Sequence, residues 1–288
     1  MYKSMKIIES LAELRAWRKE CHRQGQTVAF VPTMGNLHEG HIELVHNAHK
    51  HADLVITSIF VNPMQFGENE DLDAYPRTFE ADCEKLTAAN NHVVFYPSVA
   101  EMYPNGLKAQ TLVSVPNSTA EHCAEATQRP GHFDGVATVV TKLFNMVQPD
   151  VALFGQKDYQ QVRLVQALVR DLNMPIEIIP VPTVREESGL AKSSRNGYLT
   201  AQQKSIAPAL FQALSLIKEQ LEGGNFNTES LIESGLEFIE QAGLKPDYIE
   251  IRDTSHFEVI DENSKEAVIL VAAFLGKARL IDNLTVQL

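Results

Sequence analysis

The chain has 288 residues, of which 44% are hydrophobic and 22% are charged, and its formal net charge is −12 at pH 7. These proportions are typical of a soluble globular protein with a substantial core, and the length indicates two domains. The acidic total disfavours a general nucleic-acid binder, because that role requires a basic surface that displaces counterions.

The cysteines and the N-terminal segment indicate the compartment. Cys21, Cys83 and Cys123 are far apart and form no Cys-x-x-Cys pair, which is typical of free thiols in a reducing compartment. Glu9 and Glu13 interrupt the first twenty residues, which lack the apolar core of a signal peptide and are predicted to form an amphipathic helix. No segment reaches the length of a transmembrane helix. We therefore expect a cytoplasmic protein without a membrane partner.

Apolar, β-branched runs alternate with helix-like patterns through the first two-thirds of the chain. The expected strands are Thr27–Val31, Leu54–Val61, Val93–Tyr96, Val151–Phe154 and Ile176–Val181. The expected helices are Ile8–Arg23, Gly40–Ala52, Thr78–Ala89, Val136–Met146 and Tyr159–Asp171. This alternation predicts an α/β fold, a Rossmann-like doubly wound parallel sheet with helices on both faces. Ligands of such a sheet lie beyond the carboxyl ends of its strands.

The pattern changes after Thr183. Two helix-like stretches, Gln202–Leu221 and Thr228–Ala242, precede three strand-like segments, Tyr248–Arg252, Ala267–Ala273 and Arg279–Leu288. Helices followed by strands predict a second, smaller α+β domain. We therefore expect a Rossmann-like catalytic domain over residues 1–183 and a C-terminal domain over 184–288, joined near Pro180–Arg185.

The most specific motif spans residues 32–41, Pro-Thr-Met-Gly-Asn-Leu-His-Glu-Gly-His, between an expected strand and an expected helix. A turn that opens a helix can bind phosphate, because the first helical amides lack partners and the helix dipole is positive there. His38 and His41 can both face such a turn. A metal pair is the alternative, although no cluster of Cys or carboxylate ligands follows to complete a zinc site. The nearby His46, His49 and His51 are expected on the solvated side of the helix.

Two further motifs follow expected strands. Asn62 and Gln65 carry neutral amides, which can bind the hydroxyl and carboxylate oxygens of a small hydroxy acid. In the segment Gly155-Gln156-Lys157-Asp158, the glycine allows close backbone approach to a nucleotide and Lys157 supplies a mobile cation. The alternatives are a turn-stabilising amide for Gln65 and a plain helix-capping turn for residues 155–158. Of the two glutamines that follow, Gln160 and Gln161, one is expected to point into the cleft.

A polar segment in the C-terminal part, Lys192-Ser193-Ser194-Arg195, places two hydroxyls between two cations. This arrangement suits the β- and γ-phosphates of ATP through charge-assisted hydrogen bonds, whereas the alternative for such a string is a helix cap. The turn Arg129–Gly135 leaves two interpretations of His132 open, a ligand contact and a structural histidine at a helix start.

Together, these motifs resemble those of the nucleotidylyltransferase superfamily, which has a His-x-Gly-His signature. The preceding Pro-Thr-Met-Gly, with Asp73–Thr78 and Arg279–Asn283 in the same order, narrows the resemblance to the pantothenate synthetases, the pantoate–β-alanine ligases. This family resemblance implies a two-step ligase. Pantoate attacks the α-phosphate of ATP to give pantoyl adenylate and pyrophosphate, and β-alanine then displaces AMP to give pantothenate. It also implies magnesium on the phosphates, a homodimer and no nucleic-acid partner.

The resemblance further implies roles for individual residues. His41 would be the proton donor, with His38, Lys157 and Arg195 completing the catalytic set. Gln65, Gln161 and Asn62 would hold the pantoate and β-alanine. Tyr75 and Asp82 fall near the dimer contact and the metal–phosphate end, which makes Asp82 a candidate magnesium ligand. The implied ATP contacts are Met34, Gly35, Asn36, Leu37, His38, Glu39, Gly40, His41, Gly155, Gln156, Lys157, Asp158, Val184, Lys192, Ser193, Ser194 and Arg195.

Three positions depart from the family pattern. Gln156 stands where relatives usually carry Glu, Lys192 replaces a more usual apolar residue, and Asp134 occupies a position that is often basic. Two other functions stay open: another adenylyltransferase of the superfamily, which would release pyrophosphate without AMP, and a nucleotide-binding regulatory module without turnover. In the ligase, the C-terminal domain is expected to act as a lid, with Gly189 as a pivot.

Overall fold

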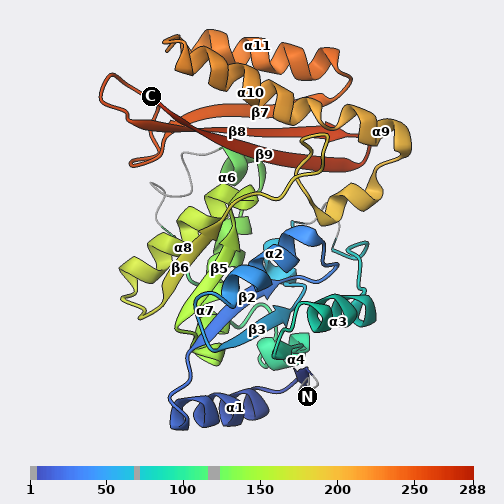
Figure 1. Ribbon diagram of the computed structural model, residues 1–288, viewed down its shortest axis with the longest axis vertical. Coiled ribbons are helices and arrows are strands. Elements are labelled where there is room, and N and C mark those ends of the chain that lie inside the picture. Colours follow the sequence, from blue (N-terminus) through green and yellow to red (C-terminus); the bar gives the residue numbers. More distant parts are fainter. Residues whose placement is uncertain (1–4, 68–71, 116–123) are drawn as a thin grey trace. The chain divides into compact units, whose positions relative to one another are not determined.

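The computed structural model describes residues 5–67, 72–115 and 124–288, which form two compact units (Figure 1). The first unit contains the described residues up to 115 together with 125–156 and 160–182. The second contains Ala124, Lys157–Tyr159 and Thr183–Leu288. The short segment 157–159 therefore belongs to the second unit, although both of its neighbours along the chain belong to the first.

A six-stranded parallel sheet forms the centre of the first unit. Its strands are β1 Lys6–Ile8, β2 Val28–Thr33, β3 Leu54–Ile59, β4 Val93–Phe95, β5 Val151–Gly155 and β6 Glu177–Val181. They are arranged in the order β1-β4-β3-β2-β5-β6, and every pair is parallel. After β2 the chain first builds β3 on one side and later builds β5 on the other. The order of the strands thus reverses at β2, and ligands of open α/β sheets bind at such a point.

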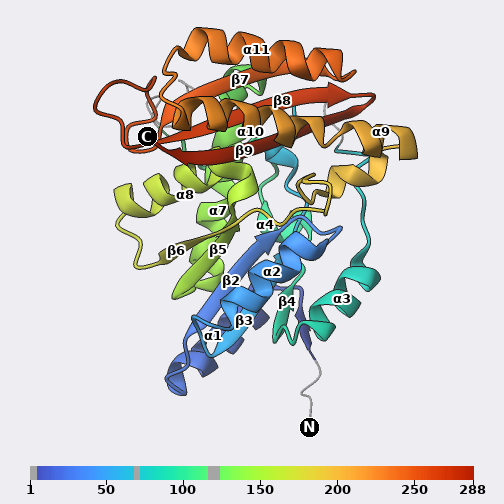
Figure 2. The same ribbon diagram turned by 45° about the horizontal axis from the view of Figure 1, so that its top comes forward.

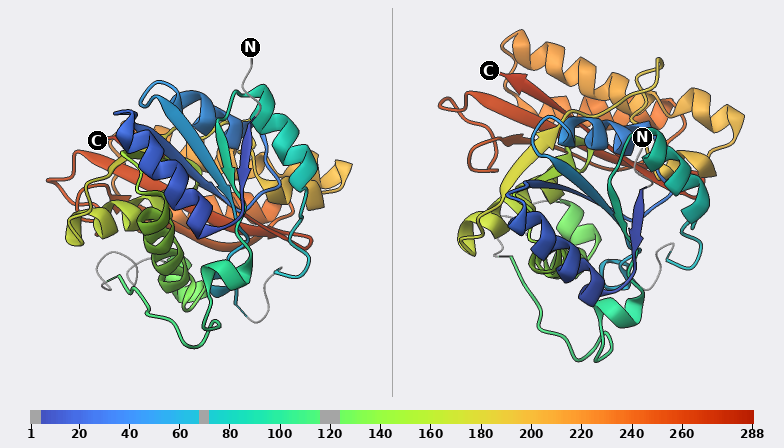
Figure 3. Two further views of the ribbon diagram at one scale, coloured as in Figure 1. Left: turned by 90° about the horizontal axis from the view of Figure 1, so that it is seen from below. Right: turned by 60° about the horizontal axis from the view of Figure 1, so that its bottom comes forward.

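Helices cover both faces of this sheet (Figure 3). The helices of this unit are α1 Leu11–Arg23, α2 Glu39–Ala48, α3 Phe79–Ala88, α4 Val99–Met102, α6 Ala124–Gln128, α7 His132–Val147 and α8 Tyr159–Asp171, of which α6 and α8 begin with a residue of the second unit. Apolar residues of α2 and α3, such as Val45 and Leu86, pack against one face. On the other face, Phe144 of α7 meets Phe30 and Phe154 edge to face. Because both faces of the sheet are buried, its strands are continuous apolar runs. The parallel sheet with helices on both faces confirms the predicted fold class.

The second unit is smaller and consists of helices beside an antiparallel sheet (Figure 2), and its buried residues form a separate core. Three strands, β7 Lys245–Asp253, β8 Glu266–Leu275 and β9 Ala278–Gln287, form an antiparallel sheet in that order. The helices are α9 Ala201–Ile206, α10 Ala209–Glu222 and α11 Thr228–Gln241. Alternate strand residues, such as Ile269 and Val271, form this core with α10 and α11. In the central strand β8, the residues between them, such as Val268 and Leu270, are buried as well.

Two predicted helices differ from the structure. The helix expected from Ile8 begins at Leu11, capped by Ser10, because residues 6–8 instead pair with β4 as the edge strand β1. The helix expected over 202–221 is divided into α9 and α10. Pro208 stands between them, where its ring and its missing N–H prevent a continuous helix.

The helix expected over Gly40–Ala52 ends at Ala48, and this changes the surroundings of one histidine. His46 and His51 are exposed as predicted, but His49 is half-buried. Its Nε2 lies 3.1 Å from the Ala89 carbonyl oxygen, and its ring meets that of His92 edge to face at 5.5 Å. The solvated position predicted for His49 is therefore wrong, because the chain turns toward α3 at the end of the helix.

Two sequence expectations concern thiols and membranes. Cys21 and Cys83 carry free thiols, and burial raises the pKa of each, while Cys123 lies outside the described residues. Over the ranges that the structure describes, no helix combines the length and apolar character needed to cross a bilayer.

Candidate active site

The histidine motif begins where β2 ends, at the strand at which the sheet order reverses. His38 is the N-cap of α2, and its Nδ1 accepts a hydrogen bond from the Gly40 amide at 3.1 Å. The Nδ1 of His41 accepts from the His38 amide at 3.2 Å, and the two ring centroids are 4.0 Å apart. Because Nδ1 is an acceptor in both rings, each neutral imidazole carries its proton on Nε2. The two histidines therefore cap the helix through Nδ1, and their Nε2–H groups are hydrogen-bond donors of the kind that phosphate oxygens accept.

Helix α3 holds the loop that leads into this motif. The fully buried Asp82 accepts hydrogen bonds from the amides of Asn36 at 2.9 Å and Leu37 at 2.7 Å, one on each carboxylate oxygen. The Lys85 amine donates to the Leu37 carbonyl oxygen at 2.5 Å. Asp82 was predicted to be a candidate magnesium ligand, whereas no role was predicted for Lys85. With both carboxylate oxygens bound to backbone amides, the geometry favours a loop-positioning role for Asp82.

The residues predicted to bind the hydroxy-acid substrate follow the neighbouring strand β3. Asn62 is buried and precedes the 3₁₀ turn η1, Pro63–Gln65. Its Nδ2 donates to Gln65 Oε1 at 3.1 Å, and Gln65 Nε2 lies 3.4 Å from the Met34 sulfur. Met34, Asn62 and Gln65, all named from the sequence, are thus in contact although they come from two different strand ends.

The turn before α7 packs against this same η1 segment. His132 Nδ1 lies 2.8 Å from the Gln65 carbonyl oxygen, and Arg129 Nη1 lies 3.0 Å from His132 Nε2. Of the two interpretations left open for His132, this geometry favours the structural one. Asp134, one of the departures from the family pattern, accepts a hydrogen bond from the Ser114 hydroxyl at 2.9 Å.

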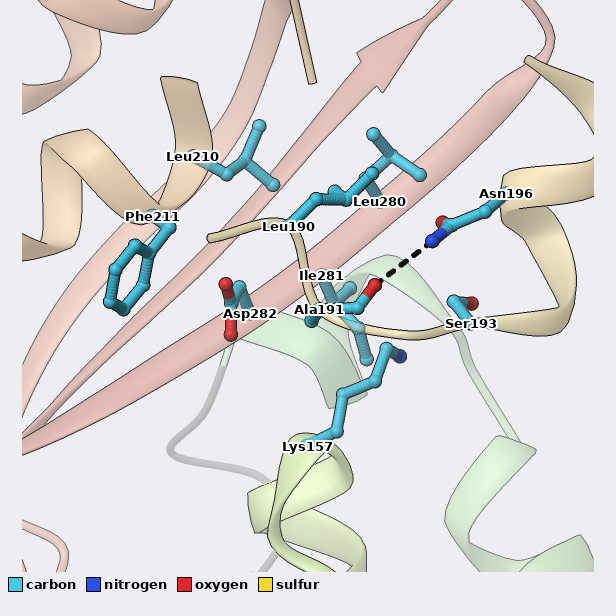
Figure 4. A pocket seen from close by; sticks show the side chains of 10 residues that line it. All are labelled: Lys157, Leu190, Ala191, Ser193, Asn196, Leu210, Phe211, Leu280, Ile281 and Asp282. Carbon is cyan, nitrogen blue, oxygen red and sulfur yellow. Dashed lines mark hydrogen bonds between the residues drawn. The ribbon is translucent and has the colours of Figure 1, made fainter. Parts of the chain in front are cut away.

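The second unit contains the segment with the predicted cationic motif, residues 192–195. The Lys192 amide donates to the Val184 carbonyl at 2.9 Å, so residues 184–192 form a tight hairpin. Ser193 then caps the 3₁₀ helix η3, Ser194–Tyr198, by accepting from the Arg195 amide at 3.3 Å. Lys157 lines a small pocket together with Ser193, Asn196 and Asp282 (Figure 4). The predicted domain boundary near residue 183 separates Lys157 from Ser193, whereas both residues belong to the second unit of the structure.

Strand β9 binds two segments that line this pocket, the hairpin 184–192 and the turn that contains Lys157. Asp282, which is 4% exposed, binds Arg185 through both carboxylate oxygens at 2.6 and 2.9 Å. Next to it, Asn283 Nδ2 donates to the Lys157 carbonyl oxygen at 2.8 Å. The Arg185 guanidinium also lies 4.0 Å from the centre of the Phe211 ring. Sequence analysis noted Asp282 and Asn283 only as part of a family motif and assigned them no role.

The expected pivot, Gly189, is a constrained position. Its φ is +90°, and an added Cβ would lie 2.6 Å from Phe211 Cδ1. Its carbonyl also accepts from Arg185 Nη1 at 3.0 Å. Glycine is required here for the turn and for close packing, and these contacts favour a rigid hairpin over a pivot at this residue.

The remaining predicted site residues lie at the end of β5, in the turn that follows it, on α8 and before α3. Gly155 ends β5, Gln156 and Asp158 lie in the following 3₁₀ turn η2, Gln156–Asp158, and Gln161 is half-buried on α8, next to the buried Gln160. Tyr75 is 6% exposed, and its ring meets that of Phe66 edge to face at 5.9 Å. Ligand contacts at all of these positions stay predictions.

Besides the carboxylates of Glu39, Asp82 and Asp158, the side chains of the predicted site residues offer cations, amides, hydroxyls and imidazoles. No group of three or more His, Cys, Asp or Glu side chains in the part of the chain that the structure describes is arranged to hold a metal ion. A site of this composition fits a polyanion that brings its own cation, as ATP does.

Comparisons with known proteins agree with this geometry. The family model described as pantoate-beta-alanine ligase matches residues 6–285. The chain is 56% identical to the pantothenate synthetase of Colwellia psychrerythraea, covering 99% of this chain and 100% of the relative, and 54% identical to that of Stutzerimonas stutzeri, covering 99% of each.

Solved structures show the same likeness. A pantothenate synthetase structure from Thermus thermophilus is 42% identical, covers 97% of this chain and 99% of its own, and aligns with a TM-score of 0.90. A pantoate-beta-alanine ligase structure from Francisella tularensis, described as complexed with β-γ ATP and β-alanine, is 36% identical, with 97% of each chain covered and a TM-score of 0.81. With matches over almost its whole length, the chain belongs to the pantoate–β-alanine ligase family.

Proposed function

We propose that this chain condenses (R)-pantoate with β-alanine through a pantoyl-adenylate intermediate, giving pantothenate, AMP and pyrophosphate. The observation that carries the proposal is the contact between Met34, in the phosphate-binding loop after β2, and Gln65, in the amide cluster after β3. A nucleotide site and a hydroxy-acid site are thereby adjacent at the point where the sheet order reverses. This is the arrangement that transfer of an adenylyl group to pantoate requires.

In the first step, an oxygen of the pantoate carboxylate attacks the α-phosphorus of ATP. The new P–O bond forms as the bond to the β-phosphate oxygen breaks, and pyrophosphate leaves with the electron pair. The attacking and leaving groups are both anionic, so donors must neutralise charge that develops on the phosphate oxygens. His38 and His41 supply Nε2–H donors, and the N-terminus of α2 adds its dipole.

In the second step, the neutral amine of β-alanine attacks the acyl carbon of pantoyl adenylate. The C–O bond to the phosphate breaks, AMP leaves, and the amine nitrogen loses a proton as the amide forms. Gln65 and Gln161 hold the pantoate portion through neutral hydrogen bonds, so that no carboxylate of the protein repels the substrate. Asn62, which was predicted to bind the substrate directly, is buried and donates both Nδ2 hydrogens within the protein, so it supports Gln65 instead.

Lys157 and residues 192–195 serve the departing pyrophosphate. The side chains of Lys157, Lys192 and Arg195 bring positive charge to one unit, and Ser193 and Ser194 add hydroxyls. We assign this unit, residues 184–288 with Lys157, the role of a lid that excludes water from the adenylate. Gly155–Asp158 and Val184 complete the ATP contacts.

Magnesium enters as part of the substrate, bound to the ATP phosphates, since Mg²⁺ usually keeps waters and binds through substrate phosphates. The working form is a homodimer in the cytoplasm. These assignments rest on the family and on the reducing-compartment pattern of the cysteines.

The test is product analysis with single omissions. Purified protein is incubated with ATP, magnesium, pantoate and β-alanine, and AMP, pyrophosphate and pantothenate are measured while each substrate is left out in turn. We expect steady formation of AMP only when both pantoate and β-alanine are present, and ATP–pyrophosphate exchange with pantoate alone. Pyrophosphate release without AMP would instead identify another adenylyltransferase. Exchange without pantoate, or exchange that requires β-alanine, would contradict the order of the steps.

A further inference from the structure

The Asn62 amide is fixed in one orientation by backbone groups. Its Oδ1 accepts from the Met64 amide at 3.3 Å, and a backbone N–H can only donate. Its Nδ2 donates to the Gly135 carbonyl at 3.2 Å, and a carbonyl oxygen can only accept. These two contacts exclude the flipped amide, because flipping would oppose donor to donor and acceptor to acceptor.

The orientation of Asn62 determines that of Gln65. Since Asn62 presents an N–H to Gln65, the nearby Gln65 atom must be its oxygen, Oε1, at 3.1 Å. The NH₂ group of Gln65 therefore points away from Asn62, on the side of Met34, whose sulfur is a weak acceptor at 3.4 Å. Gln65 thus directs its NH₂ group, and not its oxygen, toward the loop after β2 that contains Met34.

Tyr103 completes this chain of hydrogen bonds. It is 2% exposed and follows α4, and its hydroxyl lies 2.7 Å from Asn62 Oδ1, to which it donates. Burial raises the pKa of Tyr103 above its ordinary value, so the hydroxyl stays protonated and remains a donor. Its ring packs at 6.1 Å from that of Phe60, just before the amide cluster, so the hydroxyl is aimed from a packed position.

Helix α7 supplies the remaining hydrogen-bond partner of Asn62, the Gly135 carbonyl. A Cβ added at Gly135 would lie 2.4 Å from the Met64 carbonyl oxygen, so only glycine allows α7 to approach η1 this closely. That approach brings the Gly135 carbonyl within reach of Asn62. The segment Arg129–Gly135, which includes the first turn of α7 and is left without a role by the proposed reaction, therefore forms one wall of the amide cluster.

We propose that Tyr103 is a positioning residue that, through Asn62, holds the Gln65 amide with its NH₂ toward the pantoate subsite. The site then recognises the hydroxyl and carboxylate oxygens of pantoate by donation. The inference rests on the proposed function and adds to it a residue outside the predicted site.

The test is Tyr103→Phe, which removes one hydroxyl and keeps the ring. Loss of one hydrogen bond in the chain should raise the KM for pantoate in ATP–pyrophosphate exchange by about fivefold to tenfold. The KM for ATP should change by less than about twofold. Tyr96→Phe is the matched control, because Tyr96 stacks on Phe79 at 3.9 Å between centroids and is not a member of the amide cluster. It should leave both KM values unchanged.

A double-mutant cycle with Gln65→Ala separates positioning from a general structural effect. If Tyr103 acts through Gln65, Tyr103→Phe should cost less than about twofold in the KM for pantoate when Gln65 is already absent. KM does not depend on the fraction of folded enzyme, so partial unfolding cannot imitate this result. An unchanged KM for pantoate in Tyr103→Phe, or an equal cost in both backgrounds, would overturn the role of Tyr103. Absence of pantoate-dependent exchange in the unmodified protein would instead contradict the proposed function and remove the basis of this inference with it.

Discussion

The two regions proposed to bind the phosphates of ATP are built in different ways. The loop before α2 is a continuous sequence motif whose two histidines cap their own helix, and a single neighbouring helix holds its backbone. The pocket around Lys157 is instead assembled from four separate segments, with β9 binding Arg185 and the Lys157 turn. The first region is a local structure, whereas the second exists only when distant parts of the chain are folded together.

The regions also differ in charge. The first presents imidazole and backbone N–H donors, and the second presents ammonium and guanidinium groups. We infer a division of labour in which neutral donors act at the α-phosphate and cations act at the departing pyrophosphate. Each of the following substitutions affects one region and should leave the other intact.

The largest effect is expected for His41→Ala. Removing one donor at the transition state should lower the adenylation rate by roughly 10²–10³-fold. The unfolding free energy should fall by only about 1 kcal/mol, the usual cost of a helix cap. Single-turnover adenylation by rapid quench measures the first quantity and urea unfolding the second. A nearly normal adenylation rate would reduce His41 to a structural cap.

Arg195→Ala should slow adenylation by about 10–10²-fold, since it removes a charged hydrogen-bond donor from the pyrophosphate. The second half-reaction, started from supplied pantoyl adenylate and β-alanine, contains no pyrophosphate and should keep most of its rate. Comparing the two half-reactions in the same preparation checks the assignment. An equal loss in both would mean that the loop shapes the whole site.

Asp282→Ala should destabilise the second unit by about 3 kcal/mol, because it leaves Arg185 without its partner in a partly buried position. It should also raise the KM for ATP, since β9 no longer anchors the hairpin. Asp247→Ala is the matched control. It breaks another ion pair of β9, between Asp247 on β7 and Arg279 on β9, and neither of these residues lines the pocket. Both variants should unfold more easily, but only Asp282→Ala should change the KM for ATP, and an equal change in both would contradict the anchoring role.

The smallest effect, roughly tenfold on adenylation, is expected for Asp82→Asn. One backbone amide would then face an NH₂ group instead of an oxygen, a loss of about 1–3 kcal/mol. If Asp82 positions the loop, the magnesium concentration for half-maximal exchange should stay unchanged. A magnesium titration that shifts strongly in this variant would identify Asp82 as a metal ligand instead.

The sequence predicts those features that depend on neighbouring residues. The apolar runs of β2, β3 and β5 and the strand–turn–helix around His38 are local patterns, and the structure has them as expected. Strand β1 was missed because three residues carry little periodicity and are defined only by pairing with β4. Tyr103 and Lys85 were missed for a related reason. Their partners lie 41 and 48 positions away, and a lone Tyr or Lys in a sequence carries no sign of such contacts.

The most direct test of the central claim follows the oxygen atoms of pantoate. If the carboxylate attacks the α-phosphorus and AMP leaves from the acyl carbon, one carboxylate oxygen is transferred to AMP. Pantoate labelled with ¹⁸O in its carboxylate, incubated with the protein, ATP, magnesium and β-alanine, should therefore give AMP containing one ¹⁸O atom and unlabelled pyrophosphate. Unlabelled AMP, or ¹⁸O in pyrophosphate or inorganic phosphate, would contradict the adenylate mechanism.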